Sequence, residues 1–237
     1  MATHDYVIDN STGANVRADI NNVLQAILSN NSSGSSPSTT VAYMLWADTT
    51  NNLLKIRNTA NSDWITLRGL DGSLTSSADA SINSVSVGKG ANSVAGNTVL
   101  GENALDASVS GGENTAIGKE ALTALTSGVK NTAVGLSAGK ALTTGDNNTF
   151  IGRNAGTATT TADGNTGLGL NALNTNSTGA NNVAVGQQAL NGNTTANNNV
   201  AVGHQAMISN TTGTQNVAIG QTALNANTTA NNNTAVG

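Results

Sequence analysis

The chain has 237 residues, of which 9 % are charged and 2 % aromatic, with a formal net charge of −4 and no cysteine. Such a composition excludes one large aromatic core, so a folded chain must bury small side chains in thin, repeated layers. The acidic balance argues against a nucleic-acid partner, which needs clustered Lys and Arg. The missing cysteines exclude disulfides and thiolate metal sites. No apolar run reaches the ~20 residues of a membrane helix, so membrane insertion is not expected.

Residues 1–30 are predicted to contain one amphipathic helix. Its apolar side chains recur at helical spacing, and they are Val16, Ile20, Val23, Leu24, Ile27 and Leu28. A lone helix of this length is marginal in water, so the apolar face must dock on something. Two interpretations stay open: packing within its own domain, or a seam for self-association or a partner. The same N-terminus lacks the basic and apolar regions of a secretory signal, so we expect a chain that is made in the cytoplasm and is not exported by the usual secretory route.

Three further segments precede the repeats. Residues 31–40 are a Ser/Gly-rich linker that holds the only proline. Residues 41–70 predict a small β-meander with strands at 41–47, 53–57 and 64–68, separated by polar turns, and with Trp46 and Trp64 in its core. Residues 71–83 are a connector.

Residues 84–237 are a repeat with a period of 17 residues. A glycine ends a short β-branched run in every repeat, at Gly101, Gly118, Gly135, Gly152, Gly169, Gly186, Gly203, Gly220 and Gly237. Gly88 comes only 13 residues before Gly101, which we interpret as a shorter first coil. This pattern predicts a mainly β protein with a parallel β-roll or solenoid of 17-residue coils, since a regular period of this size marks stacked repeats. Eight intervals at the parallel strand spacing of ~4.8 Å give a rod of about 40 Å.

Alternation along each strand assigns two faces. We predict that the residues one and three positions before each glycine pack inside the coil, against leucines opposite. The Ala and Asn that alternate with them, two and four positions before the glycine, are predicted to face outward. The predicted core column is Val134, Ile151, Leu168, Val185, Val202 and Ile219. The predicted amide ladder is Asn131, Asn148, Asn165, Asn182, Asn199 and Asn216.

So thin a coil has little core to offset an entropy cost of roughly 1.5 kcal/mol per ordered residue. Burial of the face that carries Ala against other copies would supply the missing apolar area. We therefore expect a parallel homotrimer.

Two resemblances support this interpretation. The run Gln215 to Gly220, with Asn216-Val217-Ala218-Ile219, resembles the repeats in the heads of trimeric autotransporter adhesins, and Ser84 to Gly101 is similar to their shorter coil. That family implies a left-handed parallel β-roll wound as a trimer, although the coil here is longer and no signal peptide precedes it. Residues 1–70, with Ala42 to Thr49 and Leu54 to Asn58, resemble the N-terminal mounting segments of bacteriophage tail fibres, notably those of marine and cyanophage-like phages.

Chemistry for catalysis, metal or cofactor binding is not predicted. His204 follows Gly203 in a position that varies between repeats and is expected to be exposed. Glycoside cleavage needs a pair of carboxylates, which could come only from scattered residues such as Glu102, Asp106, Glu113 and Glu120. They more simply keep the early coils soluble. We expect no enzyme.

The expected function is a structural virion fibre subunit, a tail fibre of a bacteriophage. The N-terminal part would dock on phage tail or capsid proteins through Val16, Ile20, Val23, Leu24 and Ile27 together with Trp46 and Trp64. The repeat would project towards the host for adsorption. We also expect the natural chain to continue beyond Gly237 and to carry any contact with a host surface receptor there. The alternatives are a non-phage trimeric surface adhesin and an ice-binding solenoid, the latter prompted by paired Thr residues and absent charge.

Overall fold

The computed structural model describes residue 20 and residues 32–37, 42–69 and 79–237. The chain divides into two compact units, Met1–Ser77 and Ala78–Gly237, and the boundary falls inside the predicted connector. The predicted N-terminal helix and most of the predicted linker lie outside the described residues. Within the described part the chain is mainly β, as predicted.

The first unit contains a three-stranded antiparallel sheet in the order β1-β2-β3. Its strands are β1 (Leu45–Asp48), β2 (Leu53–Arg57) and β3 (Trp64–Gly69). The predicted meander is therefore present, but its first strand begins later than expected. Tyr43 has a φ of 64°, a turn conformation that interrupts an extended run.

The tryptophan pair lies on one face of this meander. The rings of Trp46 and Trp64 are 5.2 Å apart between centroids and tilted by 57°. The segment 32–37 runs beside them, because the indole N–H of Trp46 donates to the carbonyl of Ser33 at 3.3 Å and that of Trp64 donates to Ser36 Oγ at 2.9 Å. Both indole donors are therefore satisfied within the unit.

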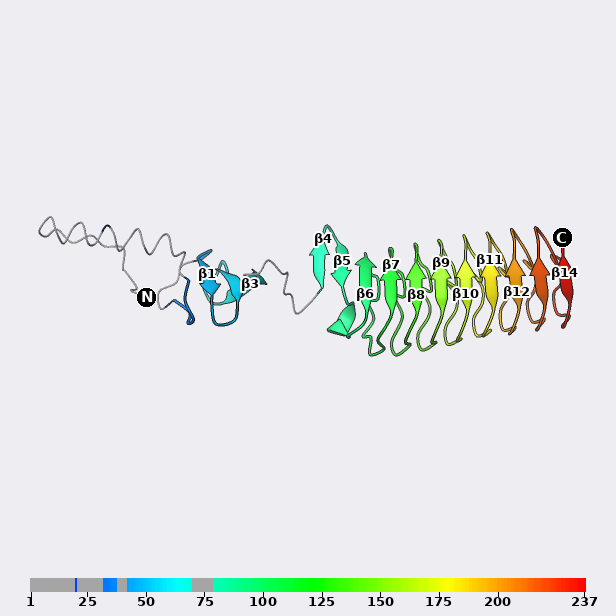
Figure 1. Cartoon of the computed structure of the whole chain (residues 1–237), viewed down its shortest axis with the longest axis horizontal. Helices are drawn as coiled ribbons and strands as arrows, with labels where there is room; N and C mark the ends of the chain where they lie inside the picture. The colour runs from blue at the N-terminus through cyan, green and yellow to red at the C-terminus, as the bar shows by residue number, and fades with distance from the viewer. Residues whose placement is uncertain (1–19, 21–31, 38–41, 70–78) are drawn as a thin grey trace, which may run out of the picture. The chain divides into compact units, whose positions relative to one another are not determined.

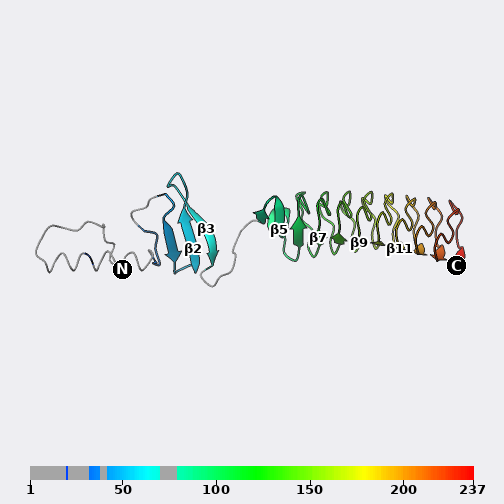
Figure 2. The ribbon, with the colours of Figure 1, turned by 90° about the horizontal axis from the view of Figure 1, so that it is seen from above.

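The second unit is a parallel β-solenoid of about eight turns with one strand in each 17-residue coil (Figure 1). Residues 17 apart pair directly, as in Thr132 with Thr149 and Val134 with Ile151, so the predicted stacking register is confirmed. Figure 2 shows the coils from above, stacked along one axis. The parallel strands are β6 (Thr98–Gly101), β7 (Thr115–Ile117), β8 (Thr132–Val134), β9 (Thr149–Ile151), β10 (Thr166–Leu168), β11 (Val183–Val185), β12 (Val200–Val202), β13 (Val217–Ile219) and β14 (Thr234–Val236).

The predicted assignment of strand faces was wrong. Asn131 and Ala133 are 0 % exposed and line the inside of the coil, whereas Ile151, Leu168 and Ile219 are 37 %, 42 % and 42 % exposed. The remaining members of the predicted core column are half-buried on the same outward face, and they are Val134, Val185 and Val202. The reason is space: leucines from the opposite wall already fill the coil, so the strand can contribute only Ala and Asn.

The inward asparagines tolerate burial because each is hydrogen-bonded to the coils on both sides. Asn182 Nδ2 donates to Asn165 Oδ1 at 3.2 Å and to the carbonyl of Ala196 at 2.8 Å. Asn182 Oδ1 accepts the backbone N–H of Asn199 at 3.0 Å. The amide ladder is thus confirmed, with its side chains inside the coil. Among the described residues, no buried side-chain nitrogen or oxygen lacks a partner.

The leucines reach the interior from a strained backbone. One residue in each of six coils has a φ between 48° and 52°, a region that bulky side chains rarely adopt. These residues are Leu105, Leu122, Leu173, Leu190, Met207 and Leu224. The first five are completely buried, so hydrophobic burial offsets the ~1–2 kcal/mol cost of this conformation.

Phe150 fills the solenoid where two leucines are missing. It replaces the small inward residue of strand β9, and the leucine position is glycine both in its own coil and in the next, at Gly139 and Gly156. A Cβ on Gly139 would lie 3.0 Å from the Phe150 ring, and a Cβ on Gly156 would clash with it. One aromatic ring thus occupies the volume of two aliphatic side chains.

The start of the solenoid also differs from the prediction. Strands β4 (Ala80–Ile82) and β5 (Val85–Gly88) form an antiparallel hairpin, and β5 runs antiparallel to β6. Residues 84–101 are therefore not a shorter parallel coil. The two loop residues, Asn83 and Ser84, have φ of 49° and 66°, as a type I′ turn requires. A short 3₁₀ turn, η1 (Ala91–Ser93), leads on to β6, and the hairpin covers this edge of the parallel sheet.

Candidate functional site

The outward strand face forms a continuous surface along the solenoid, which we call the outer ribbon. One column contains only aliphatic residues, and the neighbouring column contains Thr or Val. The first column is Leu100, Ile117, Val134, Ile151, Leu168, Val185, Val202, Ile219 and Val236; the second is Thr98, Thr115, Thr132, Thr149, Thr166, Val183, Val200, Val217 and Thr234. With rungs ~4.8 Å apart and columns about 7 Å apart, the ribbon is a narrow, regular apolar strip.

No charge interrupts the outer ribbon. Strands β6–β14 contain no Asp, Glu, Lys or Arg, and no such residue follows Asp163. Two ion pairs of the early coils lie in the turns beyond the strands: Lys119 Nζ with Glu102 at 3.0 Å and Lys140 Nζ with Glu120 at 2.8 Å. Hydrogen bonds from Lys140 and Ser137 lower the pKa of Glu120. Exposed pairs of this kind contribute little to stability. The ribbon is therefore suited to contact with another apolar surface.

The paired threonines lie on a turn and not on the sheet. The first of each pair donates its hydroxyl to a carbonyl in the next coil, as Thr143 Oγ1 does to Thr160 at 3.0 Å. The second residue of the pair is exposed, for example Thr144 and Thr195. The exposed hydroxyls thus form a single column, which is a narrow surface for ordering water.

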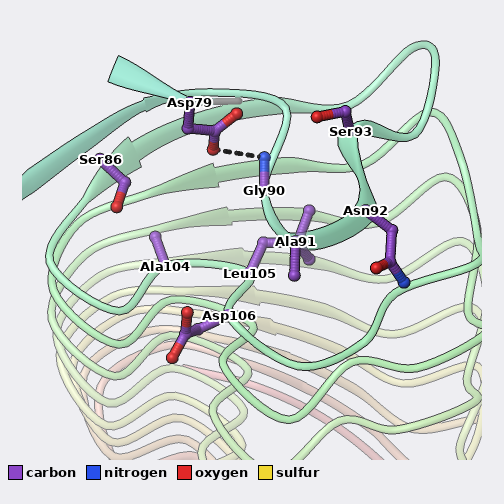
Figure 3. A pocket seen from close by; sticks show the side chains of 9 residues that line it. All are labelled: Asp79, Ser86, Gly90, Ala91, Asn92, Ser93, Ala104, Leu105 and Asp106. Atoms are coloured by element: carbon purple, nitrogen blue, oxygen red, sulfur yellow. Dashed lines mark hydrogen bonds between the residues drawn. The ribbon is translucent and has the colours of Figure 1, made fainter. Parts of the chain in front are cut away.

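A pocket of roughly 290 Å³ lies where the hairpin meets the first coil (Figure 3). One of its two acidic residues, Asp79, accepts hydrogen bonds from the backbone N–H groups of Lys89 and Gly90, each at 2.6 Å. Asp106 lies across the pocket. Both carboxylate oxygens of Asp79 thus bind the backbone that follows β5. Asp79 therefore stabilises the hairpin that covers this end of the solenoid.

The predicted docking residues are described only in part. Val16, Val23, Leu24 and Ile27 lie outside the described residues, and Ile20 is described without its neighbours. The tryptophans contact each other and cations of their own sheet: Lys55 Nζ is 4.8 Å from the Trp46 ring and Arg57 Cζ is 5.3 Å from the Trp64 ring. Their role in docking stays a prediction.

The described residues contain no group of three or more His, Cys, Asp or Glu that could hold a metal ion. His204 is exposed in its turn, as expected. In the same part of the chain, no helix has the length and apolar character needed to cross a membrane. Sequence reasoning missed the outer ribbon as a surface because it placed those residues inside the coil.

Comparisons with known proteins return no match: no family model, no curated protein and no solved structure is similar to this chain.

Proposed function

We propose that the chain is a structural fibre subunit of a virion, a bacteriophage tail fibre without enzymatic activity. In this proposal the first unit docks on phage tail or capsid proteins, and the solenoid is a shaft that extends towards the host. The observation that carries the proposal is the outer ribbon, a charge-free aliphatic strip that runs the length of a rigid rod. A monomer would leave this strip in water, whereas a multi-chain fibre buries it.

The proposed assembly is a parallel homotrimer wound about the outer ribbons. Parallel copies in register place identical Val, Ile and Leu residues opposite each other in every coil, without a charge between them. Each coil contributes one or two partly exposed aliphatic side chains, and burial of apolar area stabilises by about 25 cal/mol per Å². The resemblance to trimeric adhesin heads favours three copies. A host surface receptor remains a proposed partner.

Location on the particle tests the function. Antibodies raised against the solenoid should label thin fibres on purified phage particles in electron micrographs. A chain that lacks residues 1–40 should still form the solenoid but should be absent from particles, since the predicted docking helix is gone. Label on bacterial cell surfaces alone would favour the trimeric adhesin instead. Thermal hysteresis of ice growth, together with unlabelled particles, would favour the ice-binding alternative, for which the single hydroxyl column is the supporting feature.

A further inference from the structure

The outer ribbon changes in composition along the solenoid. Its second column carries Thr in strands β6 to β10 and Val in the next three strands, at Val183, Val200 and Val217. Strands β11–β13 therefore present two aliphatic residues outward, such as Val200 and Val202, where each earlier strand of the ribbon presents one. A Thr hydroxyl in a dry contact must find a new hydrogen-bond partner, whereas Val needs none. The ribbon is thus best suited to dry burial at β11–β13.

The interior of the same coils changes in the opposite sense. Seven residues after the glycine, the earlier coils bury Leu125 and Leu142 completely, whereas the later coils bury Asn176, Asn193 and Asn210. These amides are hydrogen-bonded, as Asn193 Nδ2 is to Asn176 Oδ1 at 2.8 Å, but they add no apolar burial. The three later coils each retain one large, completely buried apolar side chain, and these are Leu173, Leu190 and Met207. The coils with the most apolar exterior therefore have the least apolar interior.

No fixed charge opposes the burial of this part of the ribbon. Asp163 is the last Asp, Glu, Lys or Arg of the chain, so the whole of β11–β13 and its turns lack these residues. The turn residues that directly follow the three glycines after these strands are Gln187, His204 and Gln221. Two such surfaces can approach without opposing like charges and without removing a fixed charge from water.

The length and spacing of the ribbon favour a second copy of this chain as its cover. The aliphatic column occupies nine successive strands, so it spans about 40 Å at ~4.8 Å per strand. The helix predicted between Val16 and Leu28 would cover only about 20 Å at 1.5 Å per residue. A parallel second copy has a ribbon of the same length, spacing and composition, so it matches the first in every coil.

We propose that copies of the chain associate chiefly through β11–β13, and that this contact supplies the apolar packing that the interiors of these coils lack. The inference rests on the proposed fibre, because the partner is a second copy that binds through the outer ribbon. The earlier coils, which bury two large apolar side chains as Leu122 and Leu125 do, keep their fold without the contact. The later coils are stabilised by it.

Exchanging the second column between the two halves of the full-length chain tests the inference. The first variant gives β11–β13 the residue that β7–β9 carry, a change that this backbone position accepts, and it combines Val183→Thr, Val200→Thr and Val217→Thr. The matched control makes the reverse change in the earlier strands, and it combines Thr115→Val, Thr132→Val and Thr149→Val. Light scattering over a dilution series measures the concentration at which the oligomer falls to a monomer. We expect this concentration to rise by about tenfold or more in the first variant and not to rise in the control.

Hydrogen exchange followed by mass spectrometry measures the stability of each half. On dissociation, the backbone amides of residues 169–219 should exchange faster, while those of residues 101–151 stay protected. Circular dichroism checks that the first variant folds. If it does not, Val200→Thr alone replaces it, with a smaller rise in the dissociation concentration expected.

Three outcomes would overturn the inference. An oligomer that dissociates at the same concentration with and without the Val→Thr substitutions would reject β11–β13 as the main contact and leave the fibre intact. Equal protection of residues 169–219 in the monomer and the oligomer would show that these coils do not depend on a second copy. A monomeric mass of the unmodified chain would remove the fibre and this contact together.

Discussion

At the scale of single residues, the solenoid depends on small residues at fixed positions of the repeat and on hydrogen-bond partners one coil away. The glycine after each strand has a φ of 122° to 138° from Gly118 onwards, and a Cβ on Gly135 would lie 2.6 Å from the carbonyl of Gly152. These stacked glycine positions do not accept other residues, because both the positive φ and the neighbouring coil exclude a side chain. The 17-residue period is therefore fixed by sterics as well as by pairing.

Phe150→Ala should destabilise the solenoid by about 3–5 kcal/mol, since it removes the ring that fills the space of two leucines. Adding Gly139→Leu should recover part of the loss, because leucine occupies this position in most other coils at a similar φ. Chemical denaturation followed by circular dichroism measures both effects. If Phe150→Ala were no worse than Leu136→Ala, an exposed position in the same coil, the compensation argument would fail.

Asn182→Ala should cost more than its small loss of volume suggests. It leaves the N–H of Asn199 without its side-chain acceptor inside the coil, and it removes one of the two amide donors to the carbonyl of Ala196, which keeps that of Asn193. Each unsatisfied buried group costs about 1–3 kcal/mol. Gln187→Ala, at an exposed turn position, is the control and should change the denaturation midpoint very little. Equal effects of the two substitutions would contradict the role of the ladder.

At the scale of elements, the period, the strand positions and the amide ladder were predictable, because stacking in register repeats the same residue every 17 positions. Which face of each strand points into the coil was not predictable in the same way. A pattern of alternation defines two faces but does not say which is inside, and the larger Val134 was preferred over Ala133. The deciding information is that Leu122 enters the coil from a positive-φ position, which spacing alone does not reveal. The Asn83-Ser84 turn, by contrast, was a readable hairpin signal that the repeat pattern obscured.

Neighbouring residues of β12 separate the two faces. Ala201→Asp would place an unpaired charge inside the coil and should abolish the cooperative unfolding transition of the solenoid. Val202→Asp lies on the outer ribbon, so it should leave the circular dichroism spectrum unchanged while it weakens self-association. The reverse order of damage would restore the original assignment of the faces.

Acid should loosen the meander before the solenoid. Burial raises the pKa of Asp48, but hydrogen bonds from Lys55 and Asn51 outweigh it and lower the pKa from 3.8 to about 2. The stabilising contribution of this carboxylate is thus complete above pH ~4 and is lost as the pH falls towards 2. Tryptophan fluorescence reports this unit alone, since its two tryptophans are the only ones in the chain. Asp48→Asn should weaken the change in tryptophan fluorescence as the pH falls from ~4 towards 2. The same acid profile in the variant and the unmodified chain would show that the Asp48 carboxylate does not control this transition.

At the scale of the whole molecule, the solenoid presents an aliphatic surface, the outer ribbon, that the described residues do not cover. In the meander, Ile65 and Leu67 are also exposed among the described residues. A chain with 2 % aromatic residues has little core of its own, so association of copies is the simplest source of additional buried area. The fold was accessible from sequence at this scale, but the surfaces were not, because they depend on which strand face is turned outward.

The mass of the full-length chain in solution tests the central claim most directly. Light scattering after size exclusion, at micromolar concentration, should give three times the 23.5 kDa of one chain, and Val202→Asp should lower that mass without unfolding the solenoid. A monomeric mass for the unmodified chain, with the solenoid intact by circular dichroism, would contradict the fibre and the outer ribbon as its seam.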